Sequence, residues 1–144
     1  MKAPTQADLW EVLAARREGV LATIGENGLP HLSNVYYAAD PARSLLRIST
    51  TIRRIKGRNL LRDPRAVLHV PGADFFTFSV AEGHVTTSVA KTPGDAATDD
   101  LHDLHTLLDA AGDRPAFDQK MIRHGRMAVH LTVTRLYGQI FTGR

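Results

Sequence analysis

The strongest constraint on the fold is a hairpin signal near the amino end of the chain. Residues 20–24 form a short, β-branched apolar run, and Asn27-Gly28 follows at once. That pair accepts the positive φ values of a type I′ turn, which joins antiparallel strands. The return strand is predicted over 31–37, with Pro30 at its first position, where a ladder donor is dispensable. The chain therefore begins its sheet with antiparallel pairing.

The remainder of the chain repeats short strands between turn signals. Strands are predicted over 44–51, 66–70, 75–89, 127–134 and 136–141, and Gly83 is expected to mark a bulge in the long strand. A helix is predicted over 5–17, capped by Thr5, and a short basic helix is expected to end at Asp63-Pro64. This order favours an antiparallel barrel over alternating strand–helix–strand units. The fold class expected is mainly β with helices.

An insertion rich in aspartate interrupts the strands. Leucines from Leu101 to Leu108 follow helical spacing, and a second short helix is predicted from Pro115 to about His124. We therefore expect one domain over 1–144 with a helical insertion at about 91–124. The 144 residues fit one domain, and a chain of this length has little surface left to enclose a large ligand. A pocket formed between two subunits would solve that problem.

Composition excludes several classes of protein. Cysteine is absent, which excludes disulfides, cysteine-ligated zinc, iron–sulfur clusters and thiol nucleophiles. No apolar run approaches the roughly 18 residues that a membrane span needs, and residues 1–4 lack the apolar core of a secretory signal. We expect a cytoplasmic protein with no membrane partner.

Basic residues concentrate where a strand is predicted to end and a helix to begin. Residues 53–65 hold six basic side chains against one acidic side chain, Asp63, whereas 95–118 hold seven aspartates against Arg114. The acidic stretch is interpreted as a solvated helix face. The hydroxyls of Ser49, Thr50 and Thr51 precede the basic helix start, where free backbone N–H groups and the helix dipole favour an anion.

The number of cations exceeds what one phosphate requires, so the ligand is expected to be a polyanion or nucleic acid. Arg54 and Lys56 would give charge-assisted hydrogen bonds to a phosphate. Nucleic acid is disfavoured, because the stretch has no aromatic residue for base stacking and no pair of helices for groove recognition.

Other chemistries find little support in the sequence. His102 and His105 could share a helix face with Asp109, but no facing ligands are visible, so both are expected to be exposed and no metal site is predicted. The chain lacks a Gly-x-Ser-x-Gly elbow and the glycine loops of nucleotide-binding proteins. Tyr36 and Tyr37 are interpreted as packing residues on a barrel strand.

Four segments together resemble a known superfamily. The segments 19–24, 27–35, 56–66 and 80–83 resemble the pyridoxamine 5′-phosphate oxidase-like split β-barrel proteins. With Arg126-Met127 and Leu136-Tyr137-Gly138, the chain is most similar to the actinobacterial deazaflavin (coenzyme F420)-dependent reductases. The similarity spans about residue 9 to the end.

This resemblance implies a split antiparallel β-barrel of the FMN-binding type and a homodimer with cofactor sites at the subunit interface. Lys56, Arg54 and the hydroxyls of 49–51 would hold the cofactor phosphate, and the strand at 31–34 would lie near the ring. Phe76 would come from the partner subunit, together with Arg126. The implied cofactor-binding set is His31, Ser33, Asn34, Ser49, Thr50, Thr51, Arg54, Lys56, Arg58, Asn59, Phe76 and Arg126.

The resemblance favours coenzyme F420 over FMN. Ile55 stands where the pyridoxamine phosphate oxidases usually carry arginine, and F420 carries a phosphodiester and glutamates that suit a row of cations. The expected function is hydride transfer from the reduced deazaflavin to an electron-poor small molecule, with the cofactor supplying the chemistry. Water, His31 or Tyr37 would then donate a proton to the product. The alternatives are an FMN-dependent oxidase or reductase of the pyridoxamine phosphate oxidase type and a non-enzymatic F420-binding protein.

Overall fold

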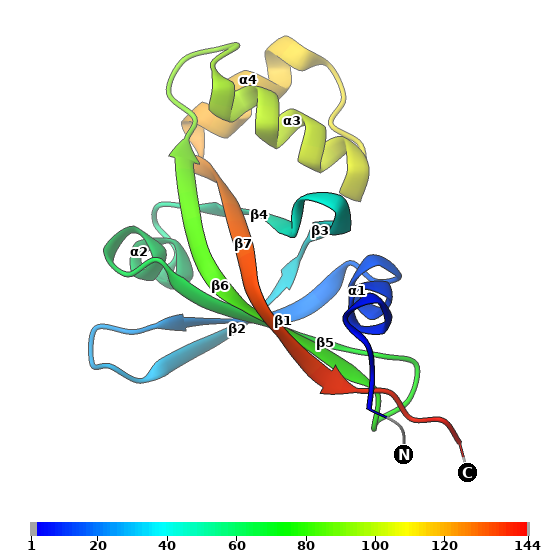
Figure 1. Cartoon of the computed structure of the whole chain (residues 1–144). Helices are drawn as coiled ribbons and strands as arrows, with labels where there is room; N and C mark the ends of the chain where they lie inside the picture. The colour runs from blue at the N-terminus through cyan, green and yellow to red at the C-terminus, as the bar shows by residue number, and fades with distance from the viewer. Residues whose placement is uncertain (1–2, 144) are drawn as a thin grey trace.

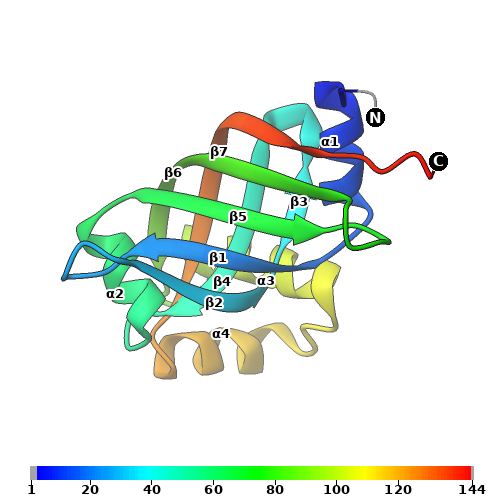
Figure 2. The same ribbon diagram turned by 90° about the horizontal axis from the view of Figure 1, so that it is seen from below.

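A computed structural model describes residues 3–143 as a curled antiparallel sheet with helices at its ends and on its outer face. The sheet has the strand order β2-β1-β5-β6-β7-β4-β3. Its strands are β1 (Glu18–Ile24), β2 (Pro30–Tyr36), β3 (Ala38–Asp40), β4 (Leu45–Thr51), β5 (Arg65–Pro71), β6 (Phe78–Val89) and β7 (Arg126–Gln139). Figure 2 shows the curl, with β3 and β4 behind β1, β2 and β5. The expected split antiparallel barrel, mainly β with helices, is confirmed.

The helices occupy three places around the sheet. They are α1 (Gln6–Ala14), the 3-10 turn η1 (Pro41–Arg43), α2 (Ile55–Arg62), α3 (Ala96–Leu108) and α4 (Arg114–Arg123). α1 and α2 lie at opposite ends of the curled sheet, and α3 and α4 pack together outside it (Figures 1 and 2). Thr5 and Asp8 form the predicted cap of α1, each side chain accepting from the other's backbone N–H.

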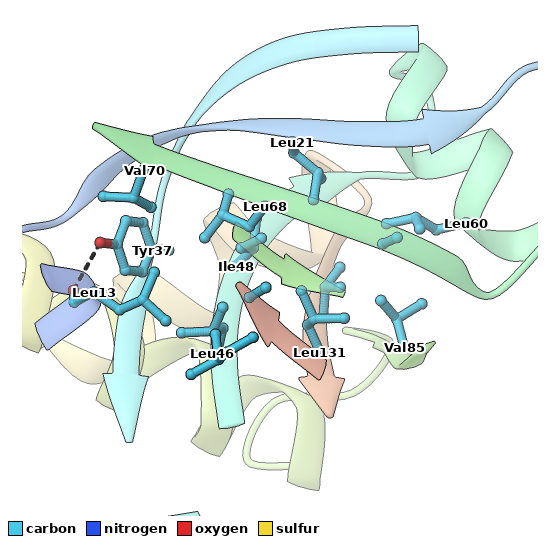
Figure 3. Packing of buried hydrophobic residues seen from close by; sticks show 14 of the residues in the cluster. Leu13, Leu21, Tyr37, Leu46, Ile48, Leu60, Leu68, Val70, Val85 and Leu131 are labelled. Atoms are coloured by element: carbon cyan, nitrogen blue, oxygen red, sulfur yellow. Dashed lines mark hydrogen bonds between the residues drawn. The ribbon is translucent and has the colours of Figure 1, made fainter. Parts of the chain in front are cut away.

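The main core fills the inside of the curl. Alternate residues of each strand point inward, as a two-residue period requires, and Leu46, Ile48 and Leu68 are among those fully buried (Figure 3). The hydroxyl of buried Tyr37 donates to the carbonyl of Leu13 at 2.7 Å. A second, smaller cluster lies between α3, α4 and the sheet; its buried members are Ala90, Ala97, Leu101, Phe117, Met121 and Ala128.

Two glycines permit close backbone contacts. A Cβ on Gly57 in α2 would lie 2.0 Å from the Thr51 carbonyl oxygen, so only glycine lets this helix begin so close to β4. A Cβ on Gly83 would lie 1.8 Å from the Thr132 carbonyl oxygen. The β6–β7 register shifts between Glu82 and Gly83, which confirms an irregularity at the predicted position, but the extra residue is Thr134 on β7 and does not lie in β6.

Local details differ from the sequence predictions. The strand predicted over 75–89 begins at Phe78, and the helix predicted over 5–17 ends at Ala14. The β1–β2 hairpin is confirmed, with Ile24 opposite Pro30, but Gly28 has a positive φ and Asn27 does not. A type I′ turn needs both, so that turn type was wrong. The two closing strands are one continuous strand, β7, and the short β3 was not predicted. Among the described residues, no helix has the length and apolar character to cross a membrane.

Candidate functional site

A cavity of about 1000 Å³ lies where the ends of β1, β2 and β4 meet the start of α2 and the inner side of α3. Its volume is at the upper end of the range for small-molecule sites. Its walls are formed by Arg17, Glu18, Gly19, Val20, Asn34, Val35, Tyr36, Ser49, Thr50, Arg54, Lys56, Pro71, His105, Leu108, Asp109 and Arg126.

One end of the cavity carries three cations that have no acidic partner. Within residues 3–143, no carboxylate lies within 4.0 Å of the charged groups of Arg54, Lys56 or Arg126. Burial lowers the pKa of Lys56, and the nearby charges of Arg54 and Arg126 lower it further. Burial and Arg54 likewise lower the pKa of Arg126, whose Nε is buried and has no hydrogen-bond partner within residues 3–143. A bound anion would relieve this mutual repulsion.

The start of α2 adds backbone donors beside these cations. Arg54 is the N-cap residue in extended conformation, and no side chain caps the first turn of the helix. The first intrahelical hydrogen bond runs from the Arg58 N–H to the Arg54 carbonyl, at 3.0 Å. The N–H groups that precede it have no partner within the helix, and the helix dipole places partial positive charge there. The arrangement has the chemistry of an anion site.

His105 joins this end of the cavity from α3. Its Nε2 lies 3.0 Å from the Ser49 Oγ, and Arg126 donates from Nη1 to the same oxygen at 3.4 Å. Burial lowers the pKa of His105, and the charges of Arg126 and Lys120 lower it further. His102 and His105 are both half-buried against the edge of Phe117, so the expectation that they are exposed was wrong.

The structure brings six of the twelve predicted cofactor-binding residues to the cavity wall. They are Asn34, Ser49, Thr50, Arg54, Lys56 and Arg126. His31 and Ser33 lie on the other face of β2 from Asn34, because successive strand residues alternate. The His31 Nδ1 and Ser33 Oγ are buried without a hydrogen-bond partner among the described residues.

The other four predicted residues are not part of this wall. Thr51 ends β4 next to it, and Arg58 is exposed on α2. Asn59 is buried, and its Nδ2 donates to the Thr23 Oγ1 at 3.0 Å, which ties α2 to β1. Phe76 is half exposed in the turn between β5 and β6, where its ring packs on Phe141 with centroids 5.4 Å apart.

Several wall residues were not predicted from the sequence. Arg17 donates to the Leu108 carbonyl at 2.7 Å, which ties the end of α3 to the start of β1. Tyr36 lines the cavity with 61% of its surface exposed, so its interpretation as a packing residue was wrong. Tyr37 does pack in the core, and because its hydroxyl is buried against Leu13 it cannot donate a proton to a ligand in the cavity.

Comparison with known proteins identifies the family. The pyridoxamine 5′-phosphate oxidase family model matches residues 6–139, so the chain belongs to this family. The fold is also found in the conserved hypothetical protein Rv2991 from Mycobacterium tuberculosis, with 23% identity, a TM-score of 0.69, and 98% of this chain and 93% of that chain covered.

Two further solved structures share the fold. A protein described as an F420 reductase matches with 23% identity and a TM-score of 0.69, over 94% of this chain and 99% of that chain. A FAD-binding protein from Mesorhizobium loti matches with 17% identity and a TM-score of 0.69, over 95% of each chain. At these sequence identities the similarity shows a shared fold alone.

Proposed function

We propose that this protein is an oxidoreductase that binds coenzyme F420 and reduces an electron-poor small molecule. The family is named for an oxidase, which supports oxidoreductase chemistry in general. The observation that carries the choice of cofactor is a group of three cations, Arg54, Lys56 and Arg126, at an uncapped helix start. None of them has a carboxylate partner among the described residues. The F420 reductase with the same fold adds support.

The residues at this end of the cavity fit a phosphorylated deazaflavin. The buried Nε of Arg126 lacks a partner that a phosphate oxygen would provide, and Lys56 and Arg54 would neutralise the phosphodiester. Arg58 is an exposed cation further along α2 and suits the glutamates of F420. When bound, the coenzyme supplies the hydride, and the protein supplies binding and orientation.

Other side chains of the cavity wall suit an aromatic ring system. Val20, Val35, Pro71 and Leu108 contribute apolar wall, and Tyr36 adds an aromatic side chain. Apolar walls with a few polar groups are typical of sites that bind flat ring systems and exclude water from them. These side chains would orient the ring, and the cations would hold the other end of the molecule. We assign no catalytic residue.

We also propose that two copies of the chain associate. The edge strand β2 and the turn before it expose Leu29, Leu32 and Tyr36, each by more than 60%. The outer backbone groups of an edge strand are unpaired, and exposed apolar side chains beside them are typical of a surface that binds another chain. Light scattering on the purified protein is expected to give the mass of a dimer, and a mass of 15.8 kDa would refute this proposal.

Titration with F420 and, separately, with FMN tests the cofactor. We expect F420 to bind with micromolar or tighter affinity and FMN to bind much more weakly. Lys56→Ala is expected to weaken F420 binding by about 1.5–3 kcal/mol, the scale of one charge-assisted hydrogen bond. Lys91→Ala is the control, because Lys91 is exposed between β6 and α3 and is no part of the cavity wall. An affinity of Lys56→Ala within twofold of the wild type would refute the anion site.

The alternatives predict different results from the same protein. Tighter binding of FMN than of F420 would favour a flavin oxidase or reductase. F420 binding without oxidation of the reduced coenzyme, across a panel of quinone and nitroaromatic acceptors, would favour a non-enzymatic F420-binding protein.

A further inference from the structure

We propose that His105 is a positioning residue for the anion site, which it serves by fixing the hydroxyl of Ser49 and, through it, the guanidinium of Arg126. The inference rests on the proposed function in one respect only, that the anion is the phosphate of the coenzyme. His105 lies on α3, far in sequence from the β4–α2 junction that provides most of the site. Its position therefore links the helical insertion to phosphate binding.

Chemistry fixes the direction of one of the two hydrogen bonds, and we assign the direction of the other. Arginine only donates, so the Ser49 Oγ accepts from Arg126. Within the described chain, the Ser49 hydroxyl has one remaining neighbour that can accept its proton, the His105 Nε2 at 3.0 Å. The ring is then neutral, with Nε2 accepting and the proton on Nδ1.

The charges around His105 agree with a neutral ring. Arg126 on β7 and Lys120 on α4 face it from two elements, whereas Asp109 and His102 approach it from α3 itself. The two cations oppose a third positive charge on the imidazole, and the carboxylate of Asp109 only partly offsets them. A neutral imidazole can accept from Ser49, so Ser49 keeps its oxygen lone pairs directed at Arg126.

The contacts from His105 to Ser49 and from Ser49 to Arg126 hold the Arg126 side chain in place before an anion binds. One terminal nitrogen of Arg126 donates to Ser49, and the Nε of Arg126 is buried with no partner in the part of the chain that the structure describes. Fixing a long cationic side chain before binding lowers the conformational entropy lost when the anion arrives. Without His105, the Ser49 hydroxyl would be free to rotate, and the guanidinium would lose its fixed acceptor.

His102 is a control that distinguishes the positioning role of His105 from packing against Phe117. The rings of His102 and His105 both meet the Phe117 ring edge-on, with centroids 5.2 Å apart in each case. Only His105 also contacts Ser49. Substitution of either histidine by phenylalanine keeps an aromatic ring against Phe117. The two variants therefore differ mainly in that His105→Phe also loses the hydrogen bond to Ser49.

The first test needs no cofactor. Long-range ¹H–¹⁵N spectra of the uniformly labelled protein report which ring nitrogen of each histidine carries the proton. We expect the Nδ1–H form for His105 in the wild type and a shift toward the Nε2–H form in Ser49→Ala. An Nε2–H ring in the wild type, or a spectrum unchanged by Ser49→Ala, would overturn the inference.

The second test measures F420 affinity in three variants by fluorescence titration. We expect His105→Phe to bind about fivefold more weakly, as for the loss of one neutral hydrogen bond. His105→Gln, whose amide oxygen can accept from Ser49, is expected to restore most of the affinity, and His102→Phe to bind like the wild type. Equal losses in His105→Phe and His102→Phe, or no recovery in His105→Gln, would overturn the positioning role.

The two tests separate failure of this inference from failure of the proposed function. If the wild type does not bind F420, the proposed cofactor is wrong, and the tautomer measurement alone then decides the role of His105. If F420 binds and the histidine variants behave alike, the cofactor stands and the positioning role falls.

Discussion

The contact between Gly57 and the Thr51 carbonyl gives the sharpest prediction about the anion site. Gly57 lies in the first turn of α2, where alanine would ordinarily stabilise a helix by about 1 kcal/mol. A Cβ here would lie 2.0 Å from the Thr51 oxygen and 3.0 Å from its carbon, however, and both are backbone atoms of a paired strand. Gly57→Ala is therefore expected to destabilise the protein although it improves helix propensity.

The expected loss of stability follows from how far α2 must move to relieve this close contact. A carbon–oxygen contact of about 3.3 Å is the closest that recurs in proteins, so α2 must move by roughly 1.3 Å at this point. Overpacking of this kind costs about 3 kcal/mol at the upper end of its usual range. After the gain in helix propensity, the free energy of unfolding is expected to fall by about 2 kcal/mol.

Urea denaturation and an F420 titration measure the two consequences. Arg58→Ala, at the next and exposed position, is the control for stability and is expected to change the free energy of unfolding by less than about 0.5 kcal/mol. Gly57→Ala should also weaken F420 binding, because the N–H groups of the helix start move away from β4. If Gly57→Ala is as stable as the wild type or more stable, then α2 does not begin against β4 as described.

Three further predictions concern stability. Asn59→Leu leaves the buried Thr23 hydroxyl without its donor and is expected to cost about 1–3 kcal/mol in urea, while adding Thr23→Val should recover part of this loss; no recovery would refute the pairing. Tyr37→Phe removes the hydrogen bond to Leu13 and should cost about 1 kcal/mol, and an unchanged unfolding midpoint would contradict it. Burial raises the pKa of Asp95, but backbone N–H donors at the start of α3 outweigh it and lower that pKa to about 2. The stabilisation is therefore complete above the unfolded value near 4 and is lost as the pH falls toward 2; Asp95→Asn should flatten this part of the pH–stability curve, and an unaltered curve would refute the assignment.

The parts of the site that lie close together in the chain could be predicted from the sequence. The hydroxyls of 49–51 and the cations that follow lie on one strand–helix junction, so their order alone predicts an anion site. His105 and Arg17 reach the cavity through tertiary packing of α3 and β1, which no local pattern encodes. Ser33 and Asn34 lie on opposite faces of β2, a separation that strand alternation predicts from the sequence.

The fold was predictable wherever turn residues separate the strands. The prediction ended one strand at Thr134 and began the next at Leu136, and so divided the continuous β7 at Thr134 and Arg135. In the structure these residues bond instead to Glu82 across the sheet, beside the bulge. Only three residues make up β3, and it depends entirely on pairing with β4, so its own sequence gives no strand signal.

The separate small core beneath α3 and α4 has a consequence for how a ligand enters and leaves. This cluster is distinct from the barrel core, and much of the remaining attachment is polar, as where Arg47 pairs with Asp100 and Asp103. Units with few buried apolar contacts open at lower free energy than the rest of a protein. We therefore expect the two helices, which carry one wall of the cavity, to open together before the rest of the protein unfolds. A ligand that needs this wall is expected to slow amide hydrogen exchange there by a factor of one plus the ratio of the free ligand concentration to Kd.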